Sequence, residues 1–342
     1  MHYTRDVNDI EPTTEETVSL RSKFDHPSGY LPDQGLVDAV NVALILNKPL
    51  LVTGDPGTGK TQLAHSIAWQ LASRRRLNVT TAEVEKFEAK STSAARDLFY
   101  TFDAIRRFQA AQNPGRGDAN GNLGNAPFIS YNALGRAVMR ALPPERVPQQ
   151  LQTEVLYNSA ARTVVLIDEI DKAPRDFPND LLNEIEQMYF RIPELDNIQV
   201  GGPAAITSDY RPIVVITSNS EKNLPDPFLR RCVYYHIPFP TTERLREILL
   251  SRLGQLPSTQ GPLIQDALAF FARLRDRKVL KRQTSPAELI DWLTYMLRRG
   301  AKPKHRLNDV RSYAFASLSA LTKDPKDQDS IRTELESFLE EA

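Results

Sequence analysis

The sequence predicts an α/β domain built on a parallel sheet, followed by a smaller all-helical domain. Three observations support this prediction. A short apolar run comes first, at residues 50–52. Continuous runs at residues 163–167, 213–217 and 232–239 are typical of strands that are covered on both faces. A glycine-rich turn follows the first run and leads into a helical pattern. After Pro240 the strand patterns stop, and helical patterns continue to the end of the chain.

Length and composition are those of a folded protein of about two domains. The chain has 342 residues, of which 41% are hydrophobic and 25% charged, which excludes a fibrous or disordered chain. We expect a polar tail over residues 1–16, an α/β core over 17–240 and a helical lid domain over 241–342. The 43 Lys and Arg residues balance 43 Asp and Glu residues. Because nucleic-acid binders usually carry a basic excess, a nucleic-acid partner is not expected.

The single cysteine and the first residues bear on location. Cys232 cannot form a disulfide within the chain, which fits a reducing compartment. It begins a predicted buried strand, so we expect a core residue and not a nucleophile. The N-terminus lacks a signal-peptide pattern, and no apolar run approaches the roughly 20 residues of a membrane helix. The expected location is cytoplasmic, without a membrane partner.

The elements of the first half follow from spacing. A helix is expected after Gly35, then the strand at 50–52, and then a helix whose buried stripe recurs every four residues. Residues 77–84 alternate and predict a second strand, and the turn-forming residues 113–126 predict an exposed loop. The two helical stripes are Leu36, Val40, Ala43 and Leu44, and Leu63, Ile67 and Leu71.

The clearest element of the second half is a helix near residue 286. Ser285 stands at its cap, Pro286 in its first position and Glu288 three residues after the cap, which together form a capping box. Gly300 provides a stop. A further strand is expected at residues 232–239, which two prolines close.

The glycine-rich turn is a complete phosphate-loop motif. Residues 54–61 match the pattern G-x-x-x-x-G-K-[ST] in full. Glycines let several backbone N–H groups point at one anion, and the helix that follows adds its positive end. Lys60 would reach the β- and γ-phosphates, and the Thr61 hydroxyl would bind Mg²⁺. An accidental glycine-rich turn is the alternative, but the strand before it and the helix after it favour phosphate binding. The expected nucleotide-binding residues are Gly54, Asp55, Pro56, Gly57, Thr58, Gly59, Lys60, Thr61 and Gln62.

Two acids end the strand at residues 163–167. Ligands gather at the carboxyl ends of parallel strands, so Asp168 and Glu169 should face the phosphate loop. Asp168 would hold Mg²⁺ directly or through water, and Glu169 would polarise an attacking water molecule. The alternative is a pair of solvated turn acids. The loop about a hundred residues upstream favours the catalytic interpretation.

Together these motifs resemble the AAA+ ATPases, and neighbouring residues resemble the MoxR family. The resemblance covers roughly residues 28–300 and rests on residues 168–174 (DEIDKAP), 179–182 (NDLL) and 228–232 (FLRRC). It implies hydrolysis of ATP with Mg²⁺ and a homo-oligomeric ring of six subunits. It also implies a client protein that is remodelled or activated, in some cases one with a von Willebrand factor A domain.

The resemblance also implies two further catalytic residues. Asn219 would orient the attacking water or contact the γ-phosphate; a polar cap on its strand is the alternative. Arg231 would be an arginine finger that acts on the ATP of a neighbouring subunit, a contribution worth about 10³ to 10⁵ in rate. A solvated surface pair with Arg230 is the alternative, and Arg230 could share or replace the role.

The chain departs from the family pattern in the lid. The family often carries Ser-Pro-Arg at the start of a lid helix, and Ala287 stands here in place of that arginine. Lys281 or Arg282 could approach the phosphates instead. Residues 30–32 offer an apolar surface for adenine, and simple packing of the first helix explains them equally well.

Four functions fit a phosphate-loop domain of this kind. The first is a ring-forming ATPase that remodels a partner protein, and the second is a nucleic-acid motor or loader. The neutral charge disfavours the second, since duplex binding needs several cations. The third is a nucleotide switch or small-molecule kinase, disfavoured by the missing guanine motif and the Asp-Glu pair. The last, a scaffold that binds ATP without turnover, does not fit the intact Lys60, Asp168 and Glu169.

Overall fold

A computed structural model of the chain describes residues 26–74, 84–112, 124–154, 159–219, 224–253, 261–277 and 280–341. The predicted tail at residues 1–16 and most of the predicted loop at 113–126 lie outside these ranges.

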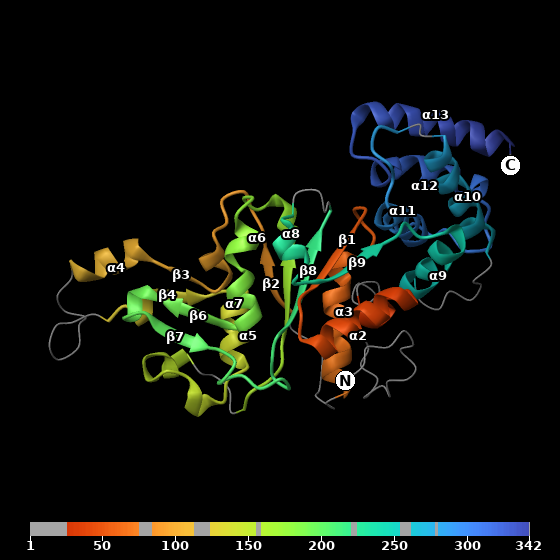
Figure 1. Cartoon of the computed structure of the whole chain (residues 1–342). Coiled ribbons are helices and arrows are strands. Elements are labelled where there is room, and N and C mark those ends of the chain that lie inside the picture. Colours follow the sequence, from red (N-terminus) through yellow and green to blue (C-terminus); the bar gives the residue numbers. More distant parts are fainter. Residues whose placement is uncertain are drawn as a thin grey trace. The chain divides into compact units, whose positions relative to one another are not determined.

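The central feature is a five-stranded sheet in the order β2-β5-β8-β1-β9 (Figure 1). The pairs β2–β5, β5–β8 and β8–β1 are all parallel, which confirms the predicted parallel sheet. The strands are β1 (Leu50–Gly54), β2 (Val84–Glu88), β5 (Val164–Asp168), β8 (Ile213–Ser218) and β9 (Val233–Ile237).

The inner strands form where the sequence is continuously apolar. Every residue of β1, β5 and β8 is buried, which confirms the prediction of strands covered on both faces for β5 and β8. The same prediction is wrong for β9, in which exposed residues alternate with less exposed ones. β2 is only partly buried and begins at Val84. The strand predicted at residues 77–84 therefore lies outside the described residues except for its last position, and the observed strand continues beyond it.

Helices and two small antiparallel sheets complete the α/β part. α5 packs against β2 and β5 and adds Leu134, Ala137 and Val138 to the core. β3 pairs with β4 and β6 pairs with β7. The bounds are α2 (Gln34–Leu46), α3 (Lys60–Arg74), β3 (Tyr100–Phe102), α4 (Ala104–Ala111), β4 (Ile129–Tyr131), α5 (Ala133–Arg140), α6 (Phe177–Asp180), α7 (Leu182–Gln187), β6 (Tyr189–Ile192), β7 (Ile198–Gly201) and α8 (Asp226–Leu229).

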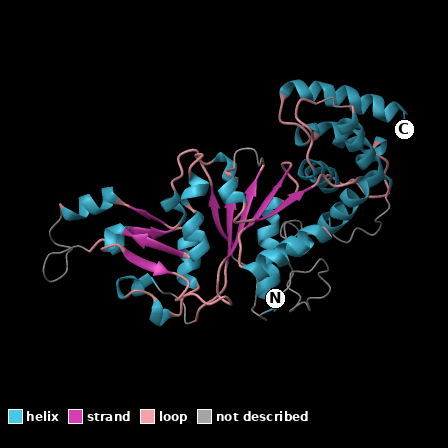
Figure 2. Cartoon of the chain, viewed as in Figure 1, coloured by secondary structure: helices cyan, strands magenta, loops and turns pink. Residues whose placement is uncertain are grey.

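Beyond residue 240 the described residues form helices and loops only, as predicted (Figure 2). Trp292 lies fully buried in their common core, and its indole N–H donates to the carbonyl of Ala314 at 3.2 Å. No helix among the described residues combines the length and apolarity needed to cross a bilayer. The helices are α9 (Thr242–Leu253), α10 (Pro262–Asp276), α11 (Pro286–Arg298), α12 (Arg311–Ala316) and α13 (Pro325–Glu341).

The predicted capping box at the start of α11 is present. The hydroxyl of Ser285 accepts the N–H of Glu288 at 3.4 Å, and the Glu288 carboxylate accepts the N–H of Ser285 at 2.8 Å. These two bonds satisfy N–H groups that the first turn of a helix otherwise leaves without partners. The start of α11 is therefore fixed at Ser285.

The chain forms two compact units that are not simple halves of the sequence. One unit contains residues Asp33–Thr53 and Ala64–His236, and therefore most of the sheet. The other combines the segment that ends at Pro32, the phosphate loop at Gly54–Leu63 and the helical part from Ile237 onward. The phosphate loop thus packs with the helical part of the chain.

Candidate nucleotide site

The phosphate loop joins β1 to α3 with a backbone that needs its glycines. Gly54, Gly57 and Gly59 have φ values of 147°, 77° and 89°, which residues with a side chain rarely adopt. The loop ends where α3 begins at Lys60, so Thr61 and Gln62 stand in the first turn of that helix. The motif found in the sequence therefore has the strand-loop-helix context that it requires.

Lys60 lies inside this loop. Its ammonium group donates to the carbonyl oxygens of Gly54 at 2.8 Å and Asp55 at 3.0 Å, and the residue is only 8% exposed. The Thr58 hydroxyl donates to the same Asp55 oxygen at 2.8 Å. The loop is thus curled around a positive charge, which is the arrangement that binds an anion.

Two of the loop glycines also make approaches that a side chain would block. A Cβ atom at Gly57 would lie 2.7 Å from the hydroxyl oxygen of Ser285, the cap of α11. A Cβ atom at Gly59 would lie 3.0 Å from the ring of Tyr30. The loop is therefore packed against the start of α11 on one side and against Tyr30 on the other.

Helix α9 holds the segment around Tyr30 by its backbone. The Ser251 hydroxyl donates to the carbonyl of Gly29 at 2.9 Å. The Arg244 guanidinium donates to the carbonyls of Leu31 at 2.8 Å and Pro32 at 3.0 Å. Residues 30–32 thus stand beside the phosphate loop, as a segment that contacts the base would, and Tyr30 itself is buried against Gly59.

The carboxylate that ends β5 is held by two neighbouring strands. Oδ1 of Asp168 accepts the Thr217 hydroxyl of β8 at 2.6 Å, and Oδ2 lies 2.9 Å from the ammonium of Lys86 on β2. This bond raises the pKa of Lys86, because it favours the charged ammonium. Asp168 is 7% exposed, so its charge is fixed in place and compensated.

Glu169 follows in a left-handed backbone conformation with φ of 56°. Its N–H donates to the Thr217 hydroxyl oxygen at 2.9 Å, and its carboxylate is paired with Lys172 one turn ahead. The hydrogen bond to Glu169 raises the pKa of Lys172. Positive φ is uncommon outside glycine, and at the end of a strand it turns the following chain sharply away.

Asn219 belongs to the same group through Asp171. Oδ1 of Asp171 accepts the hydroxyl of Ser218 at 3.1 Å and the N–H of Asn219 at 3.2 Å. The end of β8 is therefore tied to the short 3-10 helix Ile170–Lys172, which follows Glu169. Asp168, Glu169 and Asn219 thus belong to one group at the ends of β5 and β8, which Glu169 and Asn219 join through their backbone N–H groups.

Arg231 does not join this group. It follows α8 on the surface, and its guanidinium lies 3.5 Å from the Glu186 carboxylate, with both side chains about half exposed. Arg230 is exposed as well. The neighbouring Cys232 is different: burial raises the pKa of its thiol to about 12, so the thiolate needed for nucleophilic attack is not formed near neutral pH.

The three lid residues considered above, Ala287, Lys281 and Arg282, lie in different surroundings. Ala287 stands beside Ser285 at the loop, where its Cβ would lie 3.3 Å from a Cβ atom on Gly57. The backbone N–H groups of Lys281 and Arg282 point to the Asp327 carboxylate at 3.2 and 3.5 Å, and both residues are exposed. Neither of these two basic residues has a contact with the loop among the described interactions.

The oxygen ligands that the sequence suggested for Mg²⁺ are suited to a hard cation. Mg²⁺ prefers oxygen ligands, and the carboxylate of Asp168 is of this kind. The ammonium of Lys86 already rests on Oδ2 of Asp168, which shows that this oxygen accepts a positive partner.

Sequence reasoning missed two residues of this group. Thr217 was assigned only to a strand, yet its hydroxyl bonds to both acids at the end of β5. Its position as a polar residue at the end of an otherwise apolar strand could have indicated this role. Lys86 lies just outside the predicted second strand, so no strand pattern could have placed it beside Asp168.

Comparison with known proteins supports the wider of the two family assignments. Residues 46–200 match the family model described as an AAA domain. The range contains the phosphate loop and the Asp168–Glu169 pair. The match supports the resemblance to AAA+ proteins for the part of the chain that it covers, and the narrower MoxR assignment is not confirmed.

Other comparisons are more distant. No curated protein matches the sequence. Two variants of RuvB from Thermotoga maritima are similar in structure, each over 89% of this chain. One has a TM-score of 0.44 at 17% identity over 74% of its own chain, and the other has 0.41 at 16% over 67%. Similarity at this level does not distinguish one activity from another.

Proposed function

We propose that the chain is an ATP-hydrolysing, ring-forming AAA+ protein of the MoxR kind that remodels or activates a partner protein. One observation carries the proposal: a complete phosphate loop curled around Lys60 occurs in the same chain as an Asp-Glu pair, of which Thr217 binds the Asp168 carboxylate and the Glu169 backbone. Binding alone would not need the second acid.

Each residue has a defined part in this proposal. The backbone N–H groups of residues 54–62 and the Lys60 ammonium bind the phosphates of ATP. Lys60 then exchanges its two loop carbonyls for phosphate oxygens, which are stronger partners for an ammonium group. Thr61 and Asp168 hold Mg²⁺, and Glu169 polarises the attacking water once its carboxylate leaves Lys172. Asn219 orients that water.

The proposed ring depends on Arg231 acting at the site of a neighbouring subunit. A guanidinium on the surface, held only by an exposed ion pair of low energy, is available to a second copy of the chain. In a closed ring of identical subunits, here proposed to have six, each Arg231 would reach the next subunit's ATP. The energy of hydrolysis would then act on a client protein, for which a von Willebrand factor A domain is the candidate that the resemblance suggests.

Steady-state ATPase rate per subunit, measured against protein concentration with Mg²⁺ present, tests this proposal first. A rate that rises from near zero to a plateau is expected, because each site is completed by a neighbour. A substantial rate that stays constant down to the most dilute sample would mean that each chain hydrolyses alone, and would exclude the ring mechanism.

The same assay, repeated with DNA present, distinguishes a protein remodeller from a nucleic-acid motor. With equal numbers of acidic and basic residues, the chain should show no stimulation by duplex or single-stranded DNA at low salt. DNA-stimulated hydrolysis that disappears as salt is raised would favour a nucleic-acid motor over a protein remodeller.

A further inference from the structure

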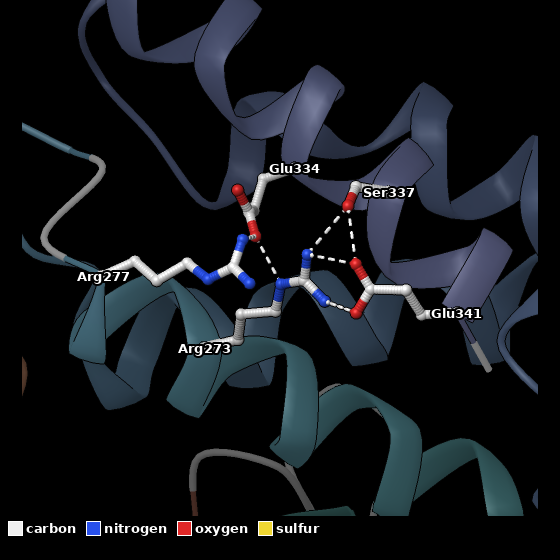
Figure 3. A network of polar contacts seen from close by, with 5 residues as sticks. All are labelled: Arg273, Arg277, Glu334, Ser337 and Glu341. Carbon is white, nitrogen blue, oxygen red and sulfur yellow. Dashed lines mark hydrogen bonds and ion pairs between the residues drawn. The ribbon is translucent and has the colours of Figure 1, made fainter.

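The end of helix α10 carries three arginines in two different environments. Arg273 and Arg277 stand four residues apart and face α13, where both bind Glu334 (Figure 3). Arg273 also reaches Glu341 at 2.5 Å and Ser337 at 2.9 Å. These two cations are therefore neutralised by carboxylates inside the helical unit.

Arg275, between them in sequence, is placed differently. Its guanidinium lies 3.4 Å from the centre of the Phe239 ring, and Nη1 donates to the carbonyl of Thr284 at 2.9 Å. Among the described residues no carboxylate lies within ion-pair distance of it. Burial lowers the pKa of Arg275, while the charges of Asp55 and Asp276 raise it. The group is thus a partly desolvated cation that lacks a close counter-charge.

The residue that Arg275 binds is next in sequence to a residue that contacts the phosphate loop. Thr284, which it holds, is followed by Ser285, and Ser285 packs on Gly57. Asp55, whose charge acts on Arg275, is itself a loop residue. The guanidinium therefore lies on the side of the helical unit that borders the loop, whereas Arg273 and Arg277 face away toward α13.

We propose that Arg275 is the side chain through which the helical unit contacts the phosphates of a nucleotide bound in the loop. An arginine has five N–H donors, and the hydrogen bond to Thr284 uses one of them. A polyphosphate would supply the missing negative charge in the geometry that a guanidinium prefers. Phe239 serves as the platform that holds the guanidinium plane in place.

The small side chain of Ala287 fits this assignment. Its Cβ would lie only 3.3 Å from a Cβ atom on Gly57, so α11 begins in close contact with the loop. A long basic side chain at position 287 would have to leave this contact. Arg275 comes from the preceding helix, α10, and binds Thr284, the residue before Ser285, so it leaves this close packing intact.

Binding of ATP, ADP and AMP to the full chain, measured by calorimetry with Mg²⁺ present, tests the proposal, which rests on the nucleotide binding proposed above. Arg275→Gln keeps a planar donor over Phe239 but removes the charge, whereas Arg275→Lys keeps the charge and loses the planar group. Arg277→Met is the matched control on the same helix.

We expect Arg275→Gln to weaken ATP binding about tenfold or more and to change AMP binding much less, because one charge-assisted contact to the outer phosphates is lost. Arg275→Lys should retain more of the ATP affinity than Gln, and Arg277→Met should leave the ATP-to-AMP affinity ratio unchanged. If Arg275 had only a structural role, the Lys variant would bind ATP more weakly than the Gln variant. The ATP-to-AMP affinity ratio would then be the same in both variants.

An unchanged ATP-to-AMP ratio in both Arg275 variants would overturn the proposal while leaving nucleotide binding by the loop intact. A wild-type chain that binds none of the three nucleotides would overturn the proposed function, and the role of Arg275 with it. Thermal unfolding of each variant shows whether a change in affinity follows a change in folding.

Discussion

The hydroxyl of Thr217 donates a hydrogen bond of 2.6 Å to Oδ1 of Asp168 and accepts the N–H of Glu169 at 2.9 Å. One side chain of β8 thus orders two consecutive acids at the end of β5. The contact follows from sheet register, because Ile216 pairs with Ile167 and Thr217 is therefore level with Asp168. The Asp168 carboxylate and the backbone of Glu169 are therefore held before any ligand binds, whereas the Glu169 carboxylate is still paired with Lys172.

Thr217→Val should lower ATPase turnover by about tenfold while leaving ATP affinity near that of the wild type. Valine has the same shape but cannot donate, so a buried oxygen of Asp168 loses its partner, at a cost of about 1–3 kcal/mol. Turnover and ATP affinity should be measured on the same preparation. Thr217→Ser keeps the hydroxyl and is the control. Equal turnover in the Val variant would show that Thr217 is not needed to orient the acids.

The parts of the fold that the sequence predicts are those set by local rules. β5 and β8 were expected because uninterrupted apolar runs belong to strands buried on both faces, and β1 because a short apolar run precedes the glycine-rich turn. Ser285 was expected as a cap because its spacing to Glu288 permits reciprocal bonds. The phosphate loop was expected because its glycines and Lys60 stand close together in the sequence and bind phosphate together.

The parts that were missed depend on how distant segments meet. Lys86 contacts Asp168 only because β2 pairs with β5, and no pattern within either strand encodes that neighbour. Arg275 looks like its neighbours Arg273 and Arg277 in the sequence. Its separate environment follows from the packing of Phe239 and Thr284 beside α10.

Glu169→Gln should bind ATP but turn it over at least about 100-fold more slowly, because the amide cannot accept a proton from the attacking water. The backbone N–H at this position still reaches Thr217, so the strand end keeps its shape. Single-turnover hydrolysis and light scattering with ATP should reveal an assembled, slowly hydrolysing state. Glu145→Gln changes an exposed carboxylate elsewhere and is the control. Full turnover in Glu169→Gln would remove this residue from the mechanism.

Glu334→Ala should destabilise the helical unit by about 1–3 kcal/mol, because Arg273 is mostly buried and loses a charge-assisted partner. Arg277 loses its 2.8 Å contact in the same variant. Urea unfolding of a Trp69→Phe background, in which Trp292 is the one remaining tryptophan, should measure the loss by fluorescence. Glu340→Ala, on the exposed side of α13, should change stability little. Equal midpoints for the two variants would show that the network in Figure 3 contributes no net stability.

Arg231→Ala and Lys60→Ala should each be nearly inactive, for different reasons. Lys60→Ala removes the ammonium that fills the phosphate loop and should abolish ATP binding. Arg231→Ala should bind ATP normally and lose about 10³-fold or more in turnover, because the finger stabilises charge that develops on the γ-phosphoryl group. Tight ATP binding by Lys60→Ala would defeat the assignment of the loop.

Mixing these two variants tests whether Arg231 acts between subunits. An Arg231→Ala subunit keeps a working loop, and a Lys60→Ala neighbour still offers its own Arg231, so mixed rings contain complete sites. At equal amounts and random assembly, about one site in four should be complete, which restores activity that neither variant has alone. Arg230→Ala is the matched control: combined with Lys60→Ala it should show no such gain over its own activity, because its Arg231 is intact. A mixture of the first pair that stays inactive would mean that Arg231 does not serve the site of a neighbouring subunit.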